Sequence, residues 1–249
     1  YGLGMLANSL TLGCDCLGEI VYLDAPMIGM DGEAGILEQA VCIHEEDNNV
    51  LWRHRDTLRN VTESRRDRRL VVSFWATLGN YDYGFFWYFH QDGNIELEVK
   101  LSGIVLTGAT EPGAPAGPYG VKVTDDLEAP HHQHFFNIRL DLDIDGPVNR
   151  IEEVEAAPEP PGPDNPWGNA FRPRATVLER ESEAKRRADP TASRCWRIVN
   201  PEVLNALGKP VAYQLITGPA PVLFAQPDSA VGRRAGRPAP TTGHAPAGC

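Results

Sequence analysis

Two runs of alternating or aromatic residues joined by a tight turn constrain the fold of this chain more than any other feature. Residues 83–90 are dominated by aromatic side chains, and the turn-forming sequence QDGN follows at 91–94. From 95 to 105 apolar residues alternate with charged ones over most of the run. An Asp-Gly pair between such runs is a strong hairpin signal, and alternation indicates a strand with one buried face. We therefore expect two antiparallel strands here.

Further segments show the same strand signals along the chain, and none shows the period of a long helix. The segments rich in β-branched or alternating residues are 69–77, 132–144, 175–181, 194–199 and 211–216. Between them, residues 156–173 are rich in Pro and Gly and predict a loop. Many short strands without helices predict an all-β fold, either a large antiparallel β-sandwich or a barrel.

The length and charge of the chain exclude several classes of function. The 249 residues carry a formal net charge of −11, which argues against a nucleic-acid partner and leaves a cationic small molecule plausible. No apolar run approaches the roughly 20 residues of a membrane helix, and no signal peptide is visible, so a cytoplasmic location is slightly favoured over a periplasmic or secreted one. The chain begins at Tyr1 inside a patterned segment, which indicates a fragment with an upstream part missing.

Two charged clusters are interpreted as ordinary surface features. The acidic run 44–47 lacks the second histidine of a metalloprotease helix, so we expect a solvated turn. The basic run 65–69 lies in an acidic protein, and we expect it to pair with carboxylates elsewhere in the chain.

The five cysteines are too few and too dispersed for a disulfide scaffold. Cys14 and Cys16 are separated by one residue, which is too tight for the usual zinc-knuckle spacing. One disulfide that joins Cys42 to Cys16 or Cys14 is one possibility. A set of free, partly buried thiols is equally compatible with the spacing.

A His-x-His pair is the first candidate for metal chemistry. His132 and His134 are two residues apart, so on a strand both imidazoles would point to the same face. Imidazoles on an apolar face need hydrogen bonds or a metal, and this arrangement suits Cu, Zn or Fe. The alternative is a hydrogen-bonded histidine cluster at the surface.

A second candidate lies further along the same predicted strand. Asp141 and Asp143 would share the face opposite the histidines, and Asp145 follows them. Carboxylate oxygens at this spacing suit hard cations such as Ca²⁺ or Mn²⁺. From the pattern alone, a solvated strand end beside a turn is the favoured interpretation.

A tyrosine-rich motif connects these observations to a known family. The segment Asn80-Tyr81-Asp82-Tyr83 resembles the signature of the copper amine oxidases, and His132-Gln133-His134 resembles their copper-binding motif about fifty residues later. Longer stretches are similar to the catalytic domain of that family, and the resemblance extends over roughly residues 1–229. They include ANSLTLGCDCLGEIVYLDA, CIHEEDNNVLWRH, YGFFWYFHQDGNIELEVKLSGIV, HHQHFFNIRLDLDIDGPVNRIEE and ATVLERESEAKRRAD.

The resemblance implies a fold, a reaction and a set of site residues. It implies a large antiparallel β-sandwich that oxidises a primary amine with O₂ and releases an aldehyde, ammonia and hydrogen peroxide. It implies that His132 and His134 bind copper and that Tyr81 is the precursor of topaquinone, formed by self-processing. Asn80 and Tyr83 would then orient the mature ring.

Three further expectations come from the same resemblance. The family's disulfide corresponds to Cys16 and Cys42. The two carboxylates Asp141 and Asp143, with the carbonyl of Leu142, correspond to part of a second metal site that binds calcium, manganese or a similar ion. The intact parent is expected to be a homodimer.

The chain departs from the family pattern at both ends. The family's catalytic aspartate would precede Tyr1, and its third copper histidine would follow residues 233–234. Residues 230–249 match nothing in the family and predict a disordered or frameshifted tail, in which His244 has no context as a ligand. Two alternatives follow: a truncated, inactive amine oxidase that at most binds metal, and a cupin-like dioxygenase with another His-x-His site.

Overall fold

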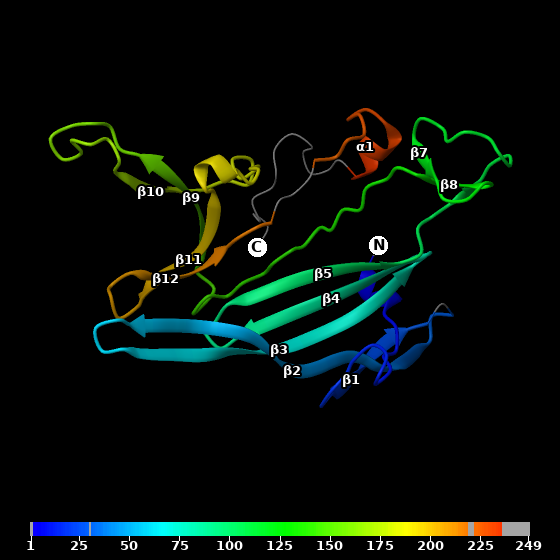
Figure 1. The fold of residues 1–249 in the computed structure, drawn as a ribbon, viewed down its shortest axis with the longest axis horizontal. Helices are drawn as coiled ribbons and strands as arrows, with labels where there is room; N and C mark the ends of the chain where they lie inside the picture. Colours follow the sequence, from blue (N-terminus) through cyan, green and yellow to red (C-terminus); the bar gives the residue numbers. More distant parts are fainter. Residues whose placement is uncertain (1, 30, 219–221, 236–249) are drawn as a thin grey trace. The chain divides into compact units, whose positions relative to one another are not determined.

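The computed structural model describes residues 2–29, 31–218 and 222–235, and the chain divides into two compact units, Tyr1–His132 and Gln133–Cys249. Both units are built from antiparallel sheets (Figure 1), which confirms the predicted all-β class. The first unit contains η1 (Leu3–Leu6), β1 (Val21–Ile28), β2 (Ala34–Asp56), β3 (Val61–Leu78), β4 (Tyr81–His90), β5 (Ile95–Gly103), β6 (Gly108–Ala109), β7 (Gly120–Lys122) and β8 (Leu127–Pro130). The second contains β9 (Arg150–Pro158), β10 (Phe171–Val177), η2 (Pro190–Ala192), β11 (Cys195–Leu204), β12 (Pro210–Leu215) and α1 (Ala230–Ala235).

The first unit is organised around a five-stranded meander in which sequence neighbours pair, in the order β1-β2-β3-β4-β5. The hairpin predicted at the QDGN turn is present, and its Gly93 has a φ of +89°, a conformation that glycine adopts without strain. Strand β5 ends at Gly103, two residues before the predicted end. The aromatic run therefore lies in the second-last strand of the meander, paired on both sides.

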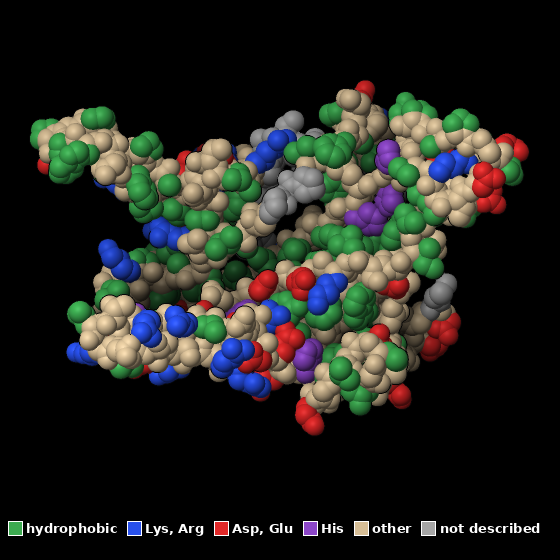
Figure 2. Space-filling model, viewed as in Figure 1, with side chains coloured by type: hydrophobic (Ala, Val, Ile, Leu, Met, Phe, Trp, Pro, Cys, Tyr) green, Lys and Arg blue, Asp and Glu red, His purple; other side chains and the backbone are tan. Residues whose placement is uncertain are grey.

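The longest hairpin of this sheet, β2–β3, pairs an acidic run with a basic one. Residues 45–47 lie opposite residues 68–70 in the register, and the ion pairs are Arg66–Asp47, Arg68–Glu45 and Arg69–Glu46. Figure 2 shows the cationic side chains gathered over this hairpin. The predicted pairing of the arginines is confirmed. The predicted acidic turn at 44–47 is wrong, because these carboxylates are held within strand β2 by their partners on β3.

A small core of the first unit contains both cysteines of the predicted disulfide. Cys16 and Cys42 are buried with Leu10, and Tyr22 packs against them. The structure describes both cysteines as free, so the predicted Cys16–Cys42 disulfide is absent from it. Burial is the main cause that raises the pKa of Cys42 to about 12, and a hydrogen bond with the Cys16 thiol adds to it. The two thiols are thus neighbours, and Cys42 is held in its protonated form.

The second unit contains a four-stranded sheet in the order β10-β9-β11-β12. Its buried cluster is centred on Trp196 of β11 and Ala184. The predicted strand 132–144 is wrong, because residues 131–143 follow a path without regular secondary structure. The predicted strand 175–181 is formed only to Val177, where β10 ends. Residues 236–249 of the predicted tail lie outside the described residues.

No helix among the described residues is long and apolar enough to cross a membrane. The location of the protein stays a prediction.

Candidate active site

Tyr81 is the first residue of β4 and follows a two-residue turn made by Gly79 and Asn80. Gly79 has a φ of +63°, which permits the tight reversal between β3 and β4. Asn80 is exposed, and its carbonyl oxygen accepts a hydrogen bond from the backbone N–H of Ile104 at 2.7 Å. The turn is thus tied to the segment that follows β5, and this tie fixes the position of the backbone at Tyr81.

The phenolic oxygen of Tyr81 contacts two groups from distant parts of the first unit. It lies 2.7 Å from Nε2 of His132, 51 residues away in sequence. It also lies 2.9 Å from the backbone nitrogen of Leu106, which donates to it. The ring of Tyr81 is partly buried, and its centroid lies 5.6 Å from that of His132. The structure therefore brings together the tyrosine and one histidine of the two motifs.

The hydrogen bond on the other side of His132 assigns its tautomer. Nδ1 of His132 lies 2.8 Å from the carbonyl oxygen of Pro130, which can only accept a hydrogen bond. Nδ1 therefore carries the proton, and Nε2 of the neutral ring presents a lone pair to Tyr81. The hydroxyl of Tyr81 donates to that lone pair. A backbone carbonyl on Nδ1 is also the usual partner of a histidine that binds a metal through Nε2.

The alternation of side chains along β4 explains why Asp82 stands between two tyrosines. Strand alternation places Tyr81 and Tyr83 on one face, with ring centroids 6.4 Å apart, and places Asp82 on the other. Oδ1 of Asp82 accepts a hydrogen bond from Thr77 at 2.5 Å, and Thr77 accepts one from Asn8 at 2.7 Å. The carboxylate therefore anchors β4 to β3. The sequence indicated this role only through the alternation, and Asn8 carried no signal.

Tyr83 lies deeper than Tyr81, with 5% of its surface exposed. Its burial, with the proximity of Tyr81, raises its pKa above the usual value for a phenol. Tyr83 therefore stays neutral, and its ring lies beside Tyr81 as a rigid neighbour.

The other predicted metal ligands lie in the second unit. His134, Asp141, Leu142 and Asp143 all belong to the irregular stretch 131–143, and both aspartates are exposed. The stretch ends at a fixed turn, because the side-chain amide of Asn200 donates to the carbonyls of the next two residues, Ile144 at 2.8 Å and Asp145 at 3.1 Å.

No group of three or more His, Cys, Asp and Glu side chains converges on a point within the described part of the chain. The donors that are present nevertheless fit copper, since imidazole nitrogen is a preferred ligand of Cu²⁺ and the oriented Nε2 of His132 is of this type. A phenolic oxygen lies directly beside that nitrogen. The arrangement can hold a phenol next to a metal bound at Nε2.

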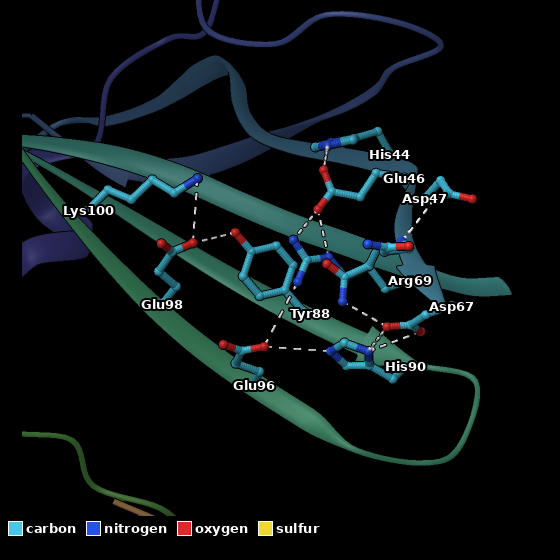
Figure 3. Close-up of polar contacts among 12 residues, drawn as sticks. His44, Glu46, Asp47, Asp67, Arg69, Tyr88, His90, Glu96, Glu98 and Lys100 are labelled. Carbon is cyan, nitrogen blue, oxygen red and sulfur yellow. Dashed lines mark hydrogen bonds and ion pairs between the residues drawn. The ribbon is translucent and has the colours of Figure 1, made fainter. Parts of the chain in front are cut away.

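A dense polar cluster occupies the opposite end of β4 (Figure 3). Nδ1 of His90 lies 3.0 Å from Oδ2 of Asp67, and Nδ2 of Asn48 donates to the same oxygen at 2.8 Å. Asp67 is buried, and the hydrogen bond from Asn48 and those from His90 lower its pKa. Glu96 lies on the other side of the imidazole, 3.7 Å from Nε2.

Next to this histidine, Tyr88 is enclosed by charged groups. Its hydroxyl donates to Glu98 at 2.6 Å, and the guanidinium carbon of Arg69 lies 3.7 Å from the centre of its ring. Arg69 is also paired with Glu46. Burial and the Glu98 carboxylate raise the pKa of Tyr88 well above its usual range. Every group of this cluster has a charged or hydrogen-bonding partner, so it joins strands β2 to β5 as a structural element.

Comparison with known proteins gives a consistent result. Residues 1–237 match a sequence model described as copper amine oxidase, enzyme domain. The chain is 50% identical over 236 residues to a histamine oxidase of Arthrobacter globiformis, and the match covers 94% of this chain and 34% of that protein. It is 43% identical to a peroxisomal diamine oxidase of Nicotiana tabacum, with 94% of this chain and 30% of that protein covered.

Solved structures agree with the sequence matches. A copper-containing benzylamine oxidase from Hansenula polymorpha superposes with a TM-score of 0.84 and 32% identity, covering 92% of this chain and 36% of that chain. The chain thus spans about a third of the length of these relatives. With its NYDY motif, its His-x-His motif and this fold, the chain belongs to the copper amine oxidase family.

Proposed function

We propose that the full gene product oxidises primary amines with O₂ to aldehydes, ammonia and hydrogen peroxide, using copper and a topaquinone made from Tyr81. The observation that carries this proposal is the contact of 2.7 Å between the phenolic oxygen of Tyr81 and Nε2 of His132. The relatives support the reaction class, since their names include histamine oxidase, methylamine oxidase and diamine oxidase.

Copper, when bound, supplies the activation of O₂ that converts the tyrosine ring to the quinone. His132 and His134 would hold the metal, and the Pro130 carbonyl leaves the lone pair of His132 on Nε2 by retaining the proton on Nδ1. The Tyr81 hydroxyl donates a hydrogen bond to Nε2 of His132. Copper held by this nitrogen would supply its chemistry beside the phenol that is to be oxidised.

The protein groups around Tyr81 restrict the motion of its ring. Asn80 fixes the start of β4 through its carbonyl, and Tyr83 lies against the ring on the same face. We assign both to the orientation of the mature ring, in which only one carbonyl must face the amine.

The second metal site is proposed at Asp141 and Asp143, with the carbonyl of Leu142 and calcium or manganese as the ion. The two carboxylates are exposed to solvent, and the turn that follows them is fixed by Asn200, so the segment presents oxygen ligands beside an ordered turn. A homodimer is proposed for the full gene product.

The decisive experiment uses the full gene product expressed without copper and then supplied with Cu²⁺ and air. A visible quinone absorption that reacts with phenylhydrazine should develop. Tyr81→Phe should abolish this chromophore, because the ring then lacks the phenolic oxygen from which oxidation starts. A phenylhydrazine-reactive chromophore that survives in Tyr81→Phe would sink the assignment.

A further inference from the structure

The end of strand β5 runs unusually close to the start of β4. Gly103 is the register partner of Tyr81, and its φ of +92° lies in the region that residues with a side chain rarely adopt. A Cβ at Gly103 would lie 2.4 Å from the carbonyl oxygen of Asn80, 2.8 Å from the nitrogen of Asp82 and 2.9 Å from Cα of Tyr81. All three are backbone atoms, so none can rotate away.

The positive φ of Gly103 also sets the direction of the chain beyond it. Immediately after this residue, the N–H of Ile104 donates to the Asn80 carbonyl at 2.7 Å. Two residues later, the N–H of Leu106 donates to the phenolic oxygen of Tyr81 at 2.9 Å. The segment 103–106 therefore holds Tyr81 at both ends, at its backbone and at its hydroxyl.

We infer that Gly103 is a positioning residue for Tyr81, and that it acts by bringing the Leu106 N–H to the phenolic oxygen. This inference rests on the proposed function, because it concerns the ring that becomes the quinone. The Leu106 N–H occupies one lone pair of the oxygen, while the hydroxyl proton is directed at His132 Nε2. With both directions occupied, the ring has one preferred orientation toward the histidine.

The chain provides a matched control for the glycine. Gly93, at the other end of the same hairpin, has a φ of +89°, but a Cβ there would meet nothing within 4 Å. Gly93→Ala and Gly103→Ala therefore introduce similar backbone strain, and only the second introduces a collision with the start of β4. A difference between the two variants reports the collision.

The test measures the rate and the absorption maximum of quinone formation in the full gene product after addition of Cu²⁺ and air. Gly103→Ala should slow formation by about tenfold or more and shift the maximum, since small misplacements of reacting groups have effects of this size. Gly93→Ala should stay within about twofold of the unmodified protein, with the same maximum. Near-ultraviolet circular dichroism of the copper-free proteins should show a changed tyrosine signal for Gly103→Ala alone.

A second pair of variants addresses the N–H directly. Replacing the amide of Leu106 by an ester, through incorporation of the α-hydroxy acid, removes the donor and should also slow formation and shift the maximum. Leu106→Ala keeps the donor and should behave as the unmodified protein does. If Gly103→Ala and the ester both form the chromophore at the normal rate and wavelength, the inference is overturned while the proposed function stands. If the unmodified protein forms no chromophore, the proposed function fails first.

Discussion

The two ends of strand β4 each carry a tyrosine next to a histidine, and the two environments differ in kind. At one end, the hydroxyl of Tyr88 donates to a carboxylate, and a guanidinium lies over the ring of this tyrosine. At the other end, the hydroxyl of Tyr81 faces the lone pair of a neutral imidazole and receives a backbone N–H. The same strand therefore presents one phenol that donates to a carboxylate and another that contacts an imidazole nitrogen and accepts a backbone N–H.

The difference shows which features separate a structural phenol from a candidate reagent. Burial disfavours a phenolate at Tyr88, and the Glu98 carboxylate adds to this cost, which is why the pKa of Tyr88 is raised. At Tyr81 the hydroxyl contacts include a backbone N–H and a histidine whose Nδ1 proton is held by a backbone carbonyl. Both residues are tyrosines near an end of the same strand. The partner of the hydroxyl makes the distinction.

The largest expected effect distinguishes His132, beside Tyr81, from His90, near Tyr88. His132→Ala should reduce the phenylhydrazine-reactive chromophore of the full gene product by more than about 100-fold, because even outer partners of a metal ligand change metal affinity by about 10- to 100-fold. His90→Ala should leave the chromophore unchanged and lower the melting temperature, because Asp67 loses a partner inside the sheet. Loss of the chromophore in a folded His90→Ala protein would contradict the contrast between the two ends.

A smaller effect is expected for the neighbour of Tyr81 on its own face. Tyr83→Phe keeps the ring that packs beside Tyr81 and removes its hydroxyl. We expect quinone formation to stay largely intact and turnover to slow by about 10- to 100-fold, because the hydroxyl of Tyr83 is expected to position the mature ring and a misoriented ring reacts less often. Stopped-flow measurement of quinone reduction by the amine, with quinone content titrated separately, distinguishes slow turnover from loss of the quinone. Equal losses in content and turnover would count against an orienting role.

Tyr88→Phe should affect stability alone. The substitution removes one hydrogen bond to a charged group, which costs about 1 to 3 kcal/mol, and the low end applies because Glu98 stays partly solvated. Urea unfolding should show a lower midpoint, while the yield and rate of chromophore formation match those of the unmodified protein. A slowed chromophore would mean that the two ends of β4 are coupled.

The smallest expected effect is a change in acid stability. The hydrogen bonds from Asn48 and His90 lower the pKa of Asp67 in the folded state. In the unfolded chain the same carboxyl has a pKa of about 4, so as the pH falls it is protonated there before it is protonated in the folded protein. The stability that Asp67 contributes is therefore present above about pH 4 and is lost as the pH falls through the lower folded value. Asp67→Asn should flatten the acid limb of a melting-temperature profile. An unchanged acid limb would show that other carboxylates dominate it.

Much of the first sheet followed from its sequence, whereas the region around the second histidine did not. The β4–β5 hairpin was predictable because the QDGN turn and the flanking alternation act over neighbouring residues. Alternation alone also suggested a strand at 132–144, yet those residues lack strand partners and follow an irregular path. Pairing is decided by residues far away in the chain, which local patterns do not contain.

The site shows the same division between local and distant information. The tyrosine and histidine motifs marked Tyr81 and His132 by type, since both carry chemistry that can be recognised in a sequence. Gly103 and the N–H of Leu106 escaped notice, because a glycine at a strand end is common and a backbone donor has no sequence signature. The Pro130 carbonyl was invisible for the same reason.

The alternation through Tyr81, Asp82 and Tyr83 has a consequence for how this gene can change. A substitution in β4 alters one side chain, but a deletion of one codon after Tyr81 would turn every following residue to the opposite face. The side chain of Tyr83 would then point to the face that Asp82 now occupies. Tyr88 would lose its contacts with both Arg69 and Glu98. The length of this strand is therefore as strictly constrained as its composition.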